Sequence, residues 1–150
     1  MQKIVVAILT ALCFCMMLAG CSNTNTYQDG TYRAEFANYD SRGYKDFLEV
    51  TVEDSMVTAI TYDAILEDGT LKSIDKKYET DMMAVQETYP ARYQQDLVNQ
   101  YLETQDIAQV DTIAGATYSS ESFAALFSAL QENMASGDTA PLVIENIAEK

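Results

Sequence analysis

The sequence predicts an α+β fold in which helices pack on an antiparallel sheet. Three observations lead to this prediction. The first part of the domain alternates apolar and polar residues, the later part carries apolar residues at helical spacing, and the strand-like runs come mostly before the helix-like ones. At 150 residues, the chain has the length of one domain with short flanking segments.

Three strands are expected before residue 66. Alternation of apolar and polar positions predicts them over Thr31–Asn38, Phe47–Glu53 and Met56–Ile65. Asp54 and Ser55 suit a two-residue hairpin turn between the last two strands. The polar residues between the first two strands are expected to form a loop.

Helices are expected in the middle and near the end of the chain. The charged segment Ser73–Glu87 has a modest helical period, and Pro90 suits the first position of a second helix. The apolar stripe of that helix is Tyr93, Leu97, Val98, Tyr101 and Leu102. Ile107–Ile113 is predicted as a strand. Ser119–Ser136 is the clearest helix, and Gly137 is a natural stop. Its apolar face is Phe123, Leu126, Phe127, Leu130 and Met134.

Residues 1–20 have the pattern of an export signal. A short positive start precedes an apolar run from Ile4 to Leu18, which is short for a transmembrane helix and typical of a signal-peptide core. The run leads into Leu18-Ala19-Gly20-Cys21, which resembles the bacterial lipobox. That resemblance implies cleavage before Cys21 and acylation of Cys21, for example with palmitate, which would hold the protein stably on a membrane. The alternatives are an uncleaved N-terminal membrane anchor and plain secretion.

These patterns predict four segments. Residues 1–20 are the signal peptide, 21–29 the lipidated cysteine and its polar tether, 30–137 the folded domain, and 138–150 a C-terminal tail. The tail contains Pro141 and a short apolar run, and the sequence leaves open whether it docks on the domain or trails from it. The expected location is the cell membrane, on its extracytoplasmic face.

Composition excludes several classes of function. The chain has no His, which removes every His-based mechanism, and its net charge of −14 argues against binding nucleic acid. Cys13 and Cys15 leave with the signal and Cys21 is acylated, so no thiol remains for catalysis or for an iron–sulfur cluster. Acidic residues show no regular ligand spacing, so no metal site is expected.

One segment has the residues for chemistry. Residues 111–120 (DTIAGATYSS) lie between a predicted strand and the clearest helix, with Thr117, Ser119 and Ser120 at the helix start. A helix N-terminus offers unpaired N–H groups and a positive dipole end, so a phosphate could bind there or esterify a hydroxyl. Residue types alone leave a simpler alternative open, in which Thr117 or Ser119 only caps the helix.

This segment resembles the signature of the FMN-binding domain family. The signature is an Asp, two residues, Ser or Thr, and then Gly-Ala-Thr. Asp111, Gly115, Ala116 and Thr117 match it, whereas Ala114 stands where Ser or Thr is usual. The family includes peripheral subunits of sodium- and ferredoxin-linked membrane oxidoreductases and many bacterial surface lipoproteins.

The resemblance covers about Asp29 to Gly137. Weaker similarities occur at Asp29–Tyr32, Gly43–Asp46 and Val50–Asp54. Together with Lys77-Tyr78 and the helix at Tyr89-Pro90, they resemble a lipoprotein subgroup described as major membrane immunogens. The family fold is α+β, in agreement with the periodicity.

The resemblance also implies a cofactor and partners. FMN would be joined through its phosphate to Thr117 by a Mg²⁺-dependent FAD:protein FMN transferase. The other expected binding residues of the segment are Gly115, Ala116, Asp111 and Tyr118.

Aromatic and basic residues are further candidates for contact with a flavin. Tyr44 and Tyr118 are candidates for stacking on the flavin ring, because aromatic faces suit it. The alternative is that each of these tyrosines is only half-buried on a face of the sheet. Arg33, Arg42 and Lys45 could pair with the flavin phosphate or ring oxygens, or form ordinary surface ion pairs.

Two functions remain as hypotheses. In the first, the protein is an electron carrier between a membrane reductase, or another redox protein, and an extracytoplasmic acceptor, rather than a self-sufficient enzyme. In the second, it is a non-redox surface lipoprotein that keeps the fold and binds a ligand or protein partner without flavin. The intact Gly-Ala-Thr favours the first hypothesis, and Ala114 favours the second.

Overall fold

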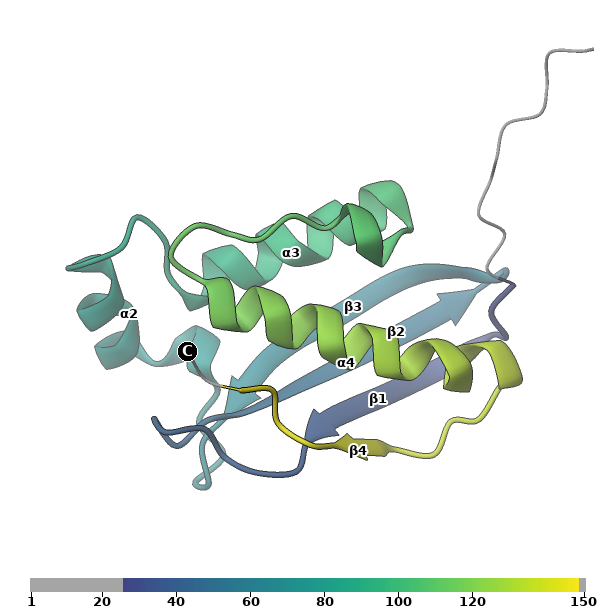
Figure 1. Ribbon diagram of the computed structural model, residues 1–150, viewed down its shortest axis with the longest axis horizontal. Helices are drawn as coiled ribbons and strands as arrows, with labels where there is room; N and C mark the ends of the chain where they lie inside the picture. The colour runs from purple at the N-terminus through teal and green to yellow at the C-terminus, as the bar shows by residue number, and fades with distance from the viewer. Residues whose placement is uncertain (1–25, 149–150) are drawn as a thin grey trace, which may run out of the picture.

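The computed structural model describes residues 26–148, which form a two-layer α+β fold (Figure 1). One layer is a four-stranded sheet with the order β3-β2-β1-β4, and the helices lie on one face of it. The predicted fold class is therefore confirmed. The predicted signal peptide and Cys21 lie outside the described residues.

The first three strands form an antiparallel meander. They are β1 (Gly30–Phe36), β2 (Lys45–Glu53) and β3 (Met56–Ile65), close to the predicted ranges, although β1 ends at Phe36 rather than Asn38. Glu53 lies opposite Met56, and the intervening Asp54 and Ser55 have φ of 52° and 64°. These positive φ values are those of the predicted two-residue hairpin turn.

Helical segments follow the meander. They are η1 (Lys72–Ile74), α2 (Lys76–Met83), α3 (Pro90–Thr104), η2 (Ile107–Gln109) and α4 (Thr117–Ser136). The predicted helix over 73–87 is split because Asp75 ends η1 and then caps α2, accepting hydrogen bonds from the N–H groups of Lys77 and Tyr78. Pro90 is at the start of α3, and Gly137 ends α4 with φ of 77°, as expected.

The strand predicted over Ile107–Ile113 is wrong. Asp106 accepts a hydrogen bond from the Ala108 N–H and starts the short turn η2, after which the chain is irregular up to α4. Ile107, Val110 and Ile113 all pack against the core. Their spacing of three does not fit the period of two that a strand requires.

The C-terminal tail docks on the sheet. Its strand β4 (Leu142–Ile144) pairs with β1 in parallel, so the sheet is mixed and not purely antiparallel as predicted. Beyond β4, the Asn146 side chain accepts from the Asn38 N–H at 2.9 Å and donates to the Asn38 carbonyl at 2.8 Å. The tail thus fixes the end of β1 and the loop that follows it.

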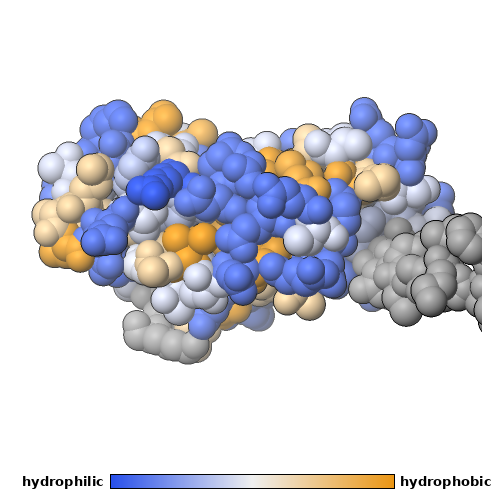
Figure 2. Space-filling model, turned by 90° about the horizontal axis from the view of Figure 1, so that it is seen from above, coloured by the Kyte–Doolittle hydropathy of each residue, from blue (hydrophilic) through white to orange (hydrophobic). Residues whose placement is uncertain are grey.

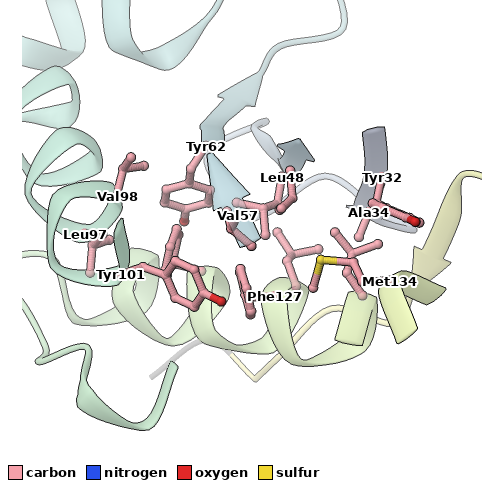
Figure 3. Close-up of a cluster of buried hydrophobic side chains, with 14 of the residues drawn as sticks. Tyr32, Ala34, Leu48, Val57, Tyr62, Leu97, Val98, Tyr101, Phe127 and Met134 are labelled. Atoms are coloured by element: carbon pink, nitrogen blue, oxygen red, sulfur yellow. The ribbon is translucent and has the colours of Figure 1, made fainter. Parts of the chain in front are cut away.

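The core lies between the sheet and helices α3 and α4 (Figure 3). Phe123, Phe127 and Leu130 of α4 have no exposed surface, which confirms the predicted apolar face of that helix. Burial of each such side chain contributes roughly 1.5–3 kcal/mol to stability. α4 is therefore held firmly against β1 and β2, and its N-terminus has a fixed position.

The surface is largely polar. The face seen in Figure 2 is mostly hydrophilic with scattered hydrophobic patches, consistent with the acidic composition. Within residues 26–148, no helix is both long and apolar enough to cross a membrane.

Candidate functional site

The N-terminus of α4 has no capping side chain. Its N-cap residue is Ala116, which makes no side-chain cap hydrogen bond. The alternative in which Thr117 or Ser119 caps the helix is therefore not what the structure shows. A helix start without such a cap presents its first N–H groups and its positive dipole end to whatever lies in front of it.

Two residues shape the loop that leads into α4. The Ser120 hydroxyl donates to the Ala116 carbonyl at 2.9 Å and accepts from the Ile113 N–H at 3.0 Å, which ties the loop to the first turn of the helix. Gly115 has φ of 80°, and a Cβ at this position would lie 2.6 Å from Gln86 Oε1. Any larger residue would therefore displace the Gln86 side chain.

Two cavities open in front of this helix start. The smaller, of about 120 Å³, is lined by Ala116, Thr117, Tyr118 and Ser119 of the loop and helix and by Lys72 and Tyr93 from elsewhere. The larger, of about 570 Å³, lies against α2 and has a volume typical of ligand sites. The two cavities adjoin, since both are lined by Arg42, Tyr78, Met82 and Gly115.

Lys72 is a buried cation beside Thr117. Its side chain is 3% exposed, and its Nζ lies 5.0 Å from the Tyr44 ring centroid and 4.7 Å from that of Tyr78, in cation–π geometry. Burial alone would lower the pKa of the ammonium. Attraction to the surrounding tyrosines, including Tyr93, and to nearby carboxylates outweighs that effect and raises the pKa above its ordinary value. Lys72 is therefore charged at neutral pH.

Two carboxylates near Lys72 are engaged with other groups. The Tyr62 hydroxyl lies 3.0 Å from Asp46 Oδ2 and 2.7 Å from the Ser119 carbonyl oxygen, which links β2 and β3 to the first turn of α4. Burial raises the pKa of Asp46. Asp40 Oδ1 accepts from the N–H groups of Arg42 and Tyr44, and this shapes the loop after β1.

Tyr44 ties the start of β2 to α2. Its hydroxyl donates to Asp75 Oδ2 at 2.5 Å, and its ring meets that of Tyr78 edge-on at a centroid distance of 5.4 Å. Burial and the bond to Asp75 raise the pKa of Tyr44. The same hydrogen bond lowers the pKa of Asp75. Because Tyr44 is buried, little of its ring is available to a ligand.

Most of the predicted site residues come together. Gly115, Ala116, Thr117 and Tyr118 line the smaller cavity, and Tyr44 lines the larger. Asp111 does not join them: its side chain is exposed and lines neither cavity, and its N–H donates to Gln100 Oε1 at 2.7 Å.

The three candidate basic residues separate into two groups. Arg42 lines both cavities. Arg33 and Lys45 instead pair with Glu35, at 3.3 Å and 2.7 Å, and line neither cavity. Arg42 therefore lies at the site, whereas Arg33 and Lys45 form ion pairs on the sheet.

Lys72 and Tyr78 were missed as site residues by reasoning from sequence. Lys72 sits in a short 3₁₀ turn next to a charged helix, and nothing in its local pattern separates it from the exposed lysines that follow. Lys72 reaches the start of α4, which lies much later in the sequence, only in the folded protein. Tyr78 lies in the charged segment Ser73–Glu87, where a single aromatic residue gives no indication of a cavity wall.

The described residues contain no group of three or more Cys, Asp or Glu side chains arranged to hold a metal ion. The groups that line the smaller cavity are those of an anion site. The smaller cavity is lined by Thr117 at the N-terminus of α4 and by two cationic residues, Lys72 and Arg42. The larger cavity adjoins it.

Comparisons with known proteins show what this chain is similar to. A family model described as the FMN-binding domain matches residues 43–131. The 15 kDa lipoprotein of Treponema pallidum (strain Nichols) is 35% identical over 133 residues, which cover 89% of this chain and 94% of the relative. The crystal structure of the CPE2226 protein from Clostridium perfringens has a TM-score of 0.77 and 32% identity, covering 81% of this chain and 99% of that one.

Proposed function

The chain belongs to the FMN-binding domain family, and on that premise we propose that it is a membrane-anchored electron carrier with FMN joined through phosphate to Thr117. The position of Thr117 supports this best. It is exposed, begins an uncapped helix and lines the small cavity with Lys72 and Arg42. A phosphodiester at Thr117 would keep one negative charge, which the helix dipole and both cations would stabilise.

The adjoining cavities suit the two parts of FMN. The smaller has room for a phosphate group, and the larger has room for the flavin ring, with Tyr78 and Met82 in its wall. When bound, FMN supplies one- or two-electron chemistry. The residues of the chain would hold the phosphate, cover part of the ring and limit its contact with water.

Attachment requires a partner enzyme, which the family resemblance gives as an FAD:protein FMN transferase. The Thr117 oxygen would bond to the FMN phosphorus of FAD, the pyrophosphate P–O bond would break, AMP would leave and the hydroxyl proton would be released. The exposure of Thr117 favours this route, because the active site of another protein must reach the hydroxyl.

Lipid anchoring at Cys21 and the extracytoplasmic location are part of the same proposal. Support comes from the lipobox-like sequence Leu18–Cys21 behind an apolar run, and from the Treponema pallidum lipoprotein that is similar over most of its length. Electrons would come from a membrane reductase or another redox protein.

One observation favours a second candidate, a non-redox binding lipoprotein. Ala114 is exposed directly before Gly115, where the family signature has a hydroxyl residue. If this change prevents recognition by the transferase, the same cavities would hold a ligand without a covalent bond.

The experiment is co-expression of the full chain with an FAD:protein FMN transferase. The wild type is expected to give a flavin-fluorescent band that survives denaturation. Thr117→Ala should abolish the band, because it removes the acceptor oxygen. The matched control is Thr112→Ala, which removes an exposed hydroxyl from the same loop and should retain the band.

The Ala114→Ser variant separates the two candidates. If the wild type stays dark while Ala114→Ser becomes fluorescent, this chain has lost covalent flavin and the binding role is favoured. If both stay dark and the purified protein has no affinity for free FMN, the redox proposal fails.

A further inference from the structure

We propose that Lys72 and the N-terminus of α4 form the two sides of a phosphate-binding site in the small cavity, and that Lys72 makes this site prefer a phosphorylated flavin to an unphosphorylated one. The inference deepens the proposed function, since the phosphate it expects is that of FMN. It concerns reversible binding, however, and needs no covalent bond.

Lys72 forms no ion pair with a carboxylate within residues 26–148. It is 3% exposed and lines the small cavity. A buried ammonium normally pairs with a carboxylate. Within residues 26–148, however, no salt bridge or hydrogen bond of the Lys72 ammonium is found, and its close contacts are the rings of Tyr44 and Tyr78.

The neighbouring carboxylates favour the charged form of Lys72, although neither forms an ion pair with it. Asp46 lies beside the Tyr62 hydroxyl, and one oxygen of Asp40 accepts two backbone N–H groups. Both carboxylates raise the pKa of the Lys72 ammonium. The ammonium thus lies against two aromatic rings that contact each other edge-on, with hydrogen-bond donors left for a ligand.

The opposite side of the cavity is the start of α4. Ala116, Thr117 and Ser119 line it, and Ala116 leaves the helix without a side-chain cap. Backbone N–H groups and a positive dipole end therefore face the same small space as the lysine. At about 120 Å³, that space suits a phosphate group rather than a three-ring flavin.

Preference for a phosphorylated ligand follows from the cost of leaving buried donors unpaired. A phosphate would accept hydrogen bonds from Lys72 and from the helix N-terminus, whereas riboflavin would leave both without a partner. Sites built around buried polar groups reject ligands that lack the matching group.

The test compares FMN with riboflavin on the full chain, by quenching of flavin fluorescence. The wild type should bind FMN about tenfold to a hundredfold more tightly, as expected for hydrogen bonds to a charged group. Lys72→Met should lose that preference and Lys72→Arg should retain much of it. Lys76→Met is the matched control: this exposed lysine pairs with Glu79, lines neither cavity and should leave the preference unchanged.

The outcomes distinguish this inference from the proposed function. If a folded Lys72→Met keeps the wild-type preference for FMN, the role of Lys72 is overturned and the flavin function is untouched. If the wild type binds neither flavin but inorganic phosphate raises its melting temperature in a Lys72-dependent manner, the anion site stands, its preference for a phosphorylated flavin is overturned, and the co-expression experiment decides the flavin function. If neither flavin nor phosphate binds, the inference is overturned.

A measurement on the wild type covers the case in which Lys72→Met does not fold. The ¹⁵N-labelled lysine ammonium signals can be followed while phosphate is added, with chloride at equal ionic strength as control. The signal that is missing from folded Lys72→Arg should shift with phosphate and not with chloride. The absence of such a shift would overturn the inference.

Discussion

At the residue scale, Gly115 combines a positive φ with a close neighbour. Gly69 has the same kind of backbone, with φ of 90°, but nothing lies within 4 Å of the position of a Cβ there. Alanine at either position should cost about 1–2 kcal/mol, because an L-residue disfavours the left-handed region. Only at Gly115 would the new methyl group also push the Gln86 side chain, which lines the larger cavity.

We therefore expect Gly115→Ala and Gly69→Ala to lower the free energy of unfolding by similar amounts, measured with urea. Flavin loading should fall in Gly115→Ala alone, because only that substitution alters the cavity wall and the loop before Thr117. Equal loading of the two variants would show that Gln86 and the loop adjust without consequence for the site.

The hydrogen bond from Tyr44 to Asp75 makes stability depend on pH. It is the main reason why the pKa of Asp75 lies below its ordinary value. A carboxylate with a lowered folded-state pKa stabilises the fold above its unfolded pKa of about 3.9, and this contribution is lost as pH falls through the folded pKa. Acid should therefore weaken the fold partly through Asp75.

We expect Tyr44→Phe to be less stable than the wild type at pH 6, with the difference shrinking as pH is lowered below about 4. Urea midpoints across this pH range measure the effect. Tyr39→Phe, at a residue that is 45% exposed, serves as control and should follow the wild-type curve. A stability difference between Tyr44→Phe and the wild type that stays constant with pH would show that the hydrogen bond to Tyr44 does not lower the pKa of Asp75.

At the element scale, the periodicity of the sequence predicted every element whose pattern is determined by burial on one face. β1 and the apolar stripe of α4 are examples, because each has one face against the same core. The conformation of Ile107–Ile113 could not be predicted from periodicity. Its apolar residues favour a strand locally, but the N-cap at Asp106 and contacts with the core determine the conformation of the backbone. The pairing of β4 with β1 depends on contacts distant in sequence.

α4 should be the element most sensitive to truncation of its side chains. Phe127 is fully buried and its ring centroid lies 4.1 Å from that of Tyr101. Phe127→Ala should lower the free energy of unfolding by about 3–5 kcal/mol through lost burial and a cavity. Val85→Ala, at a side chain that is 76% exposed, should change it by about 0.5 kcal/mol or less. A small loss for Phe127→Ala in urea denaturation would contradict the core assignment.

At the scale of the whole molecule, the site combines residues from distant parts of the chain, and this limited what the sequence could predict. Gly115, Ala116 and Thr117 were predictable because they form one contiguous motif at a helix start. Lys72 and Tyr78 were not, because only the packing of η1 and α2 beside α4 brings them there. Asp111 belongs to the motif but lies outside the cavities, so its place in the motif does not imply ligand contact in this structure.

The proposed lipid anchor is also tested at the scale of the whole molecule. Cys21→Ala should prevent incorporation of labelled fatty acid and release the protein from the membrane fraction, because the acyl chains would be the only hydrophobic attachment proposed. Cys15→Ala is the control, since that cysteine lies in the predicted signal peptide and should leave labelling intact. Equal labelling of Cys21→Ala and the wild type would end the lipoprotein proposal.

In the proposed anchored protein, the length of α4 would set the height of the site above the bilayer. The Gln28 N–H donates to the Met134 carbonyl at 2.8 Å, so the chain enters the domain beside the C-terminal end of α4, while Thr117 stands at the other end. Twenty residues of helix span about 30 Å. If Cys21 is the anchor and α4 stands perpendicular to the membrane, Thr117 lies about 30 Å farther from the bilayer than Gln28, where the tether joins the domain. A redox partner must then project well out of the membrane, or exchange electrons only when the domain tilts towards the lipid surface.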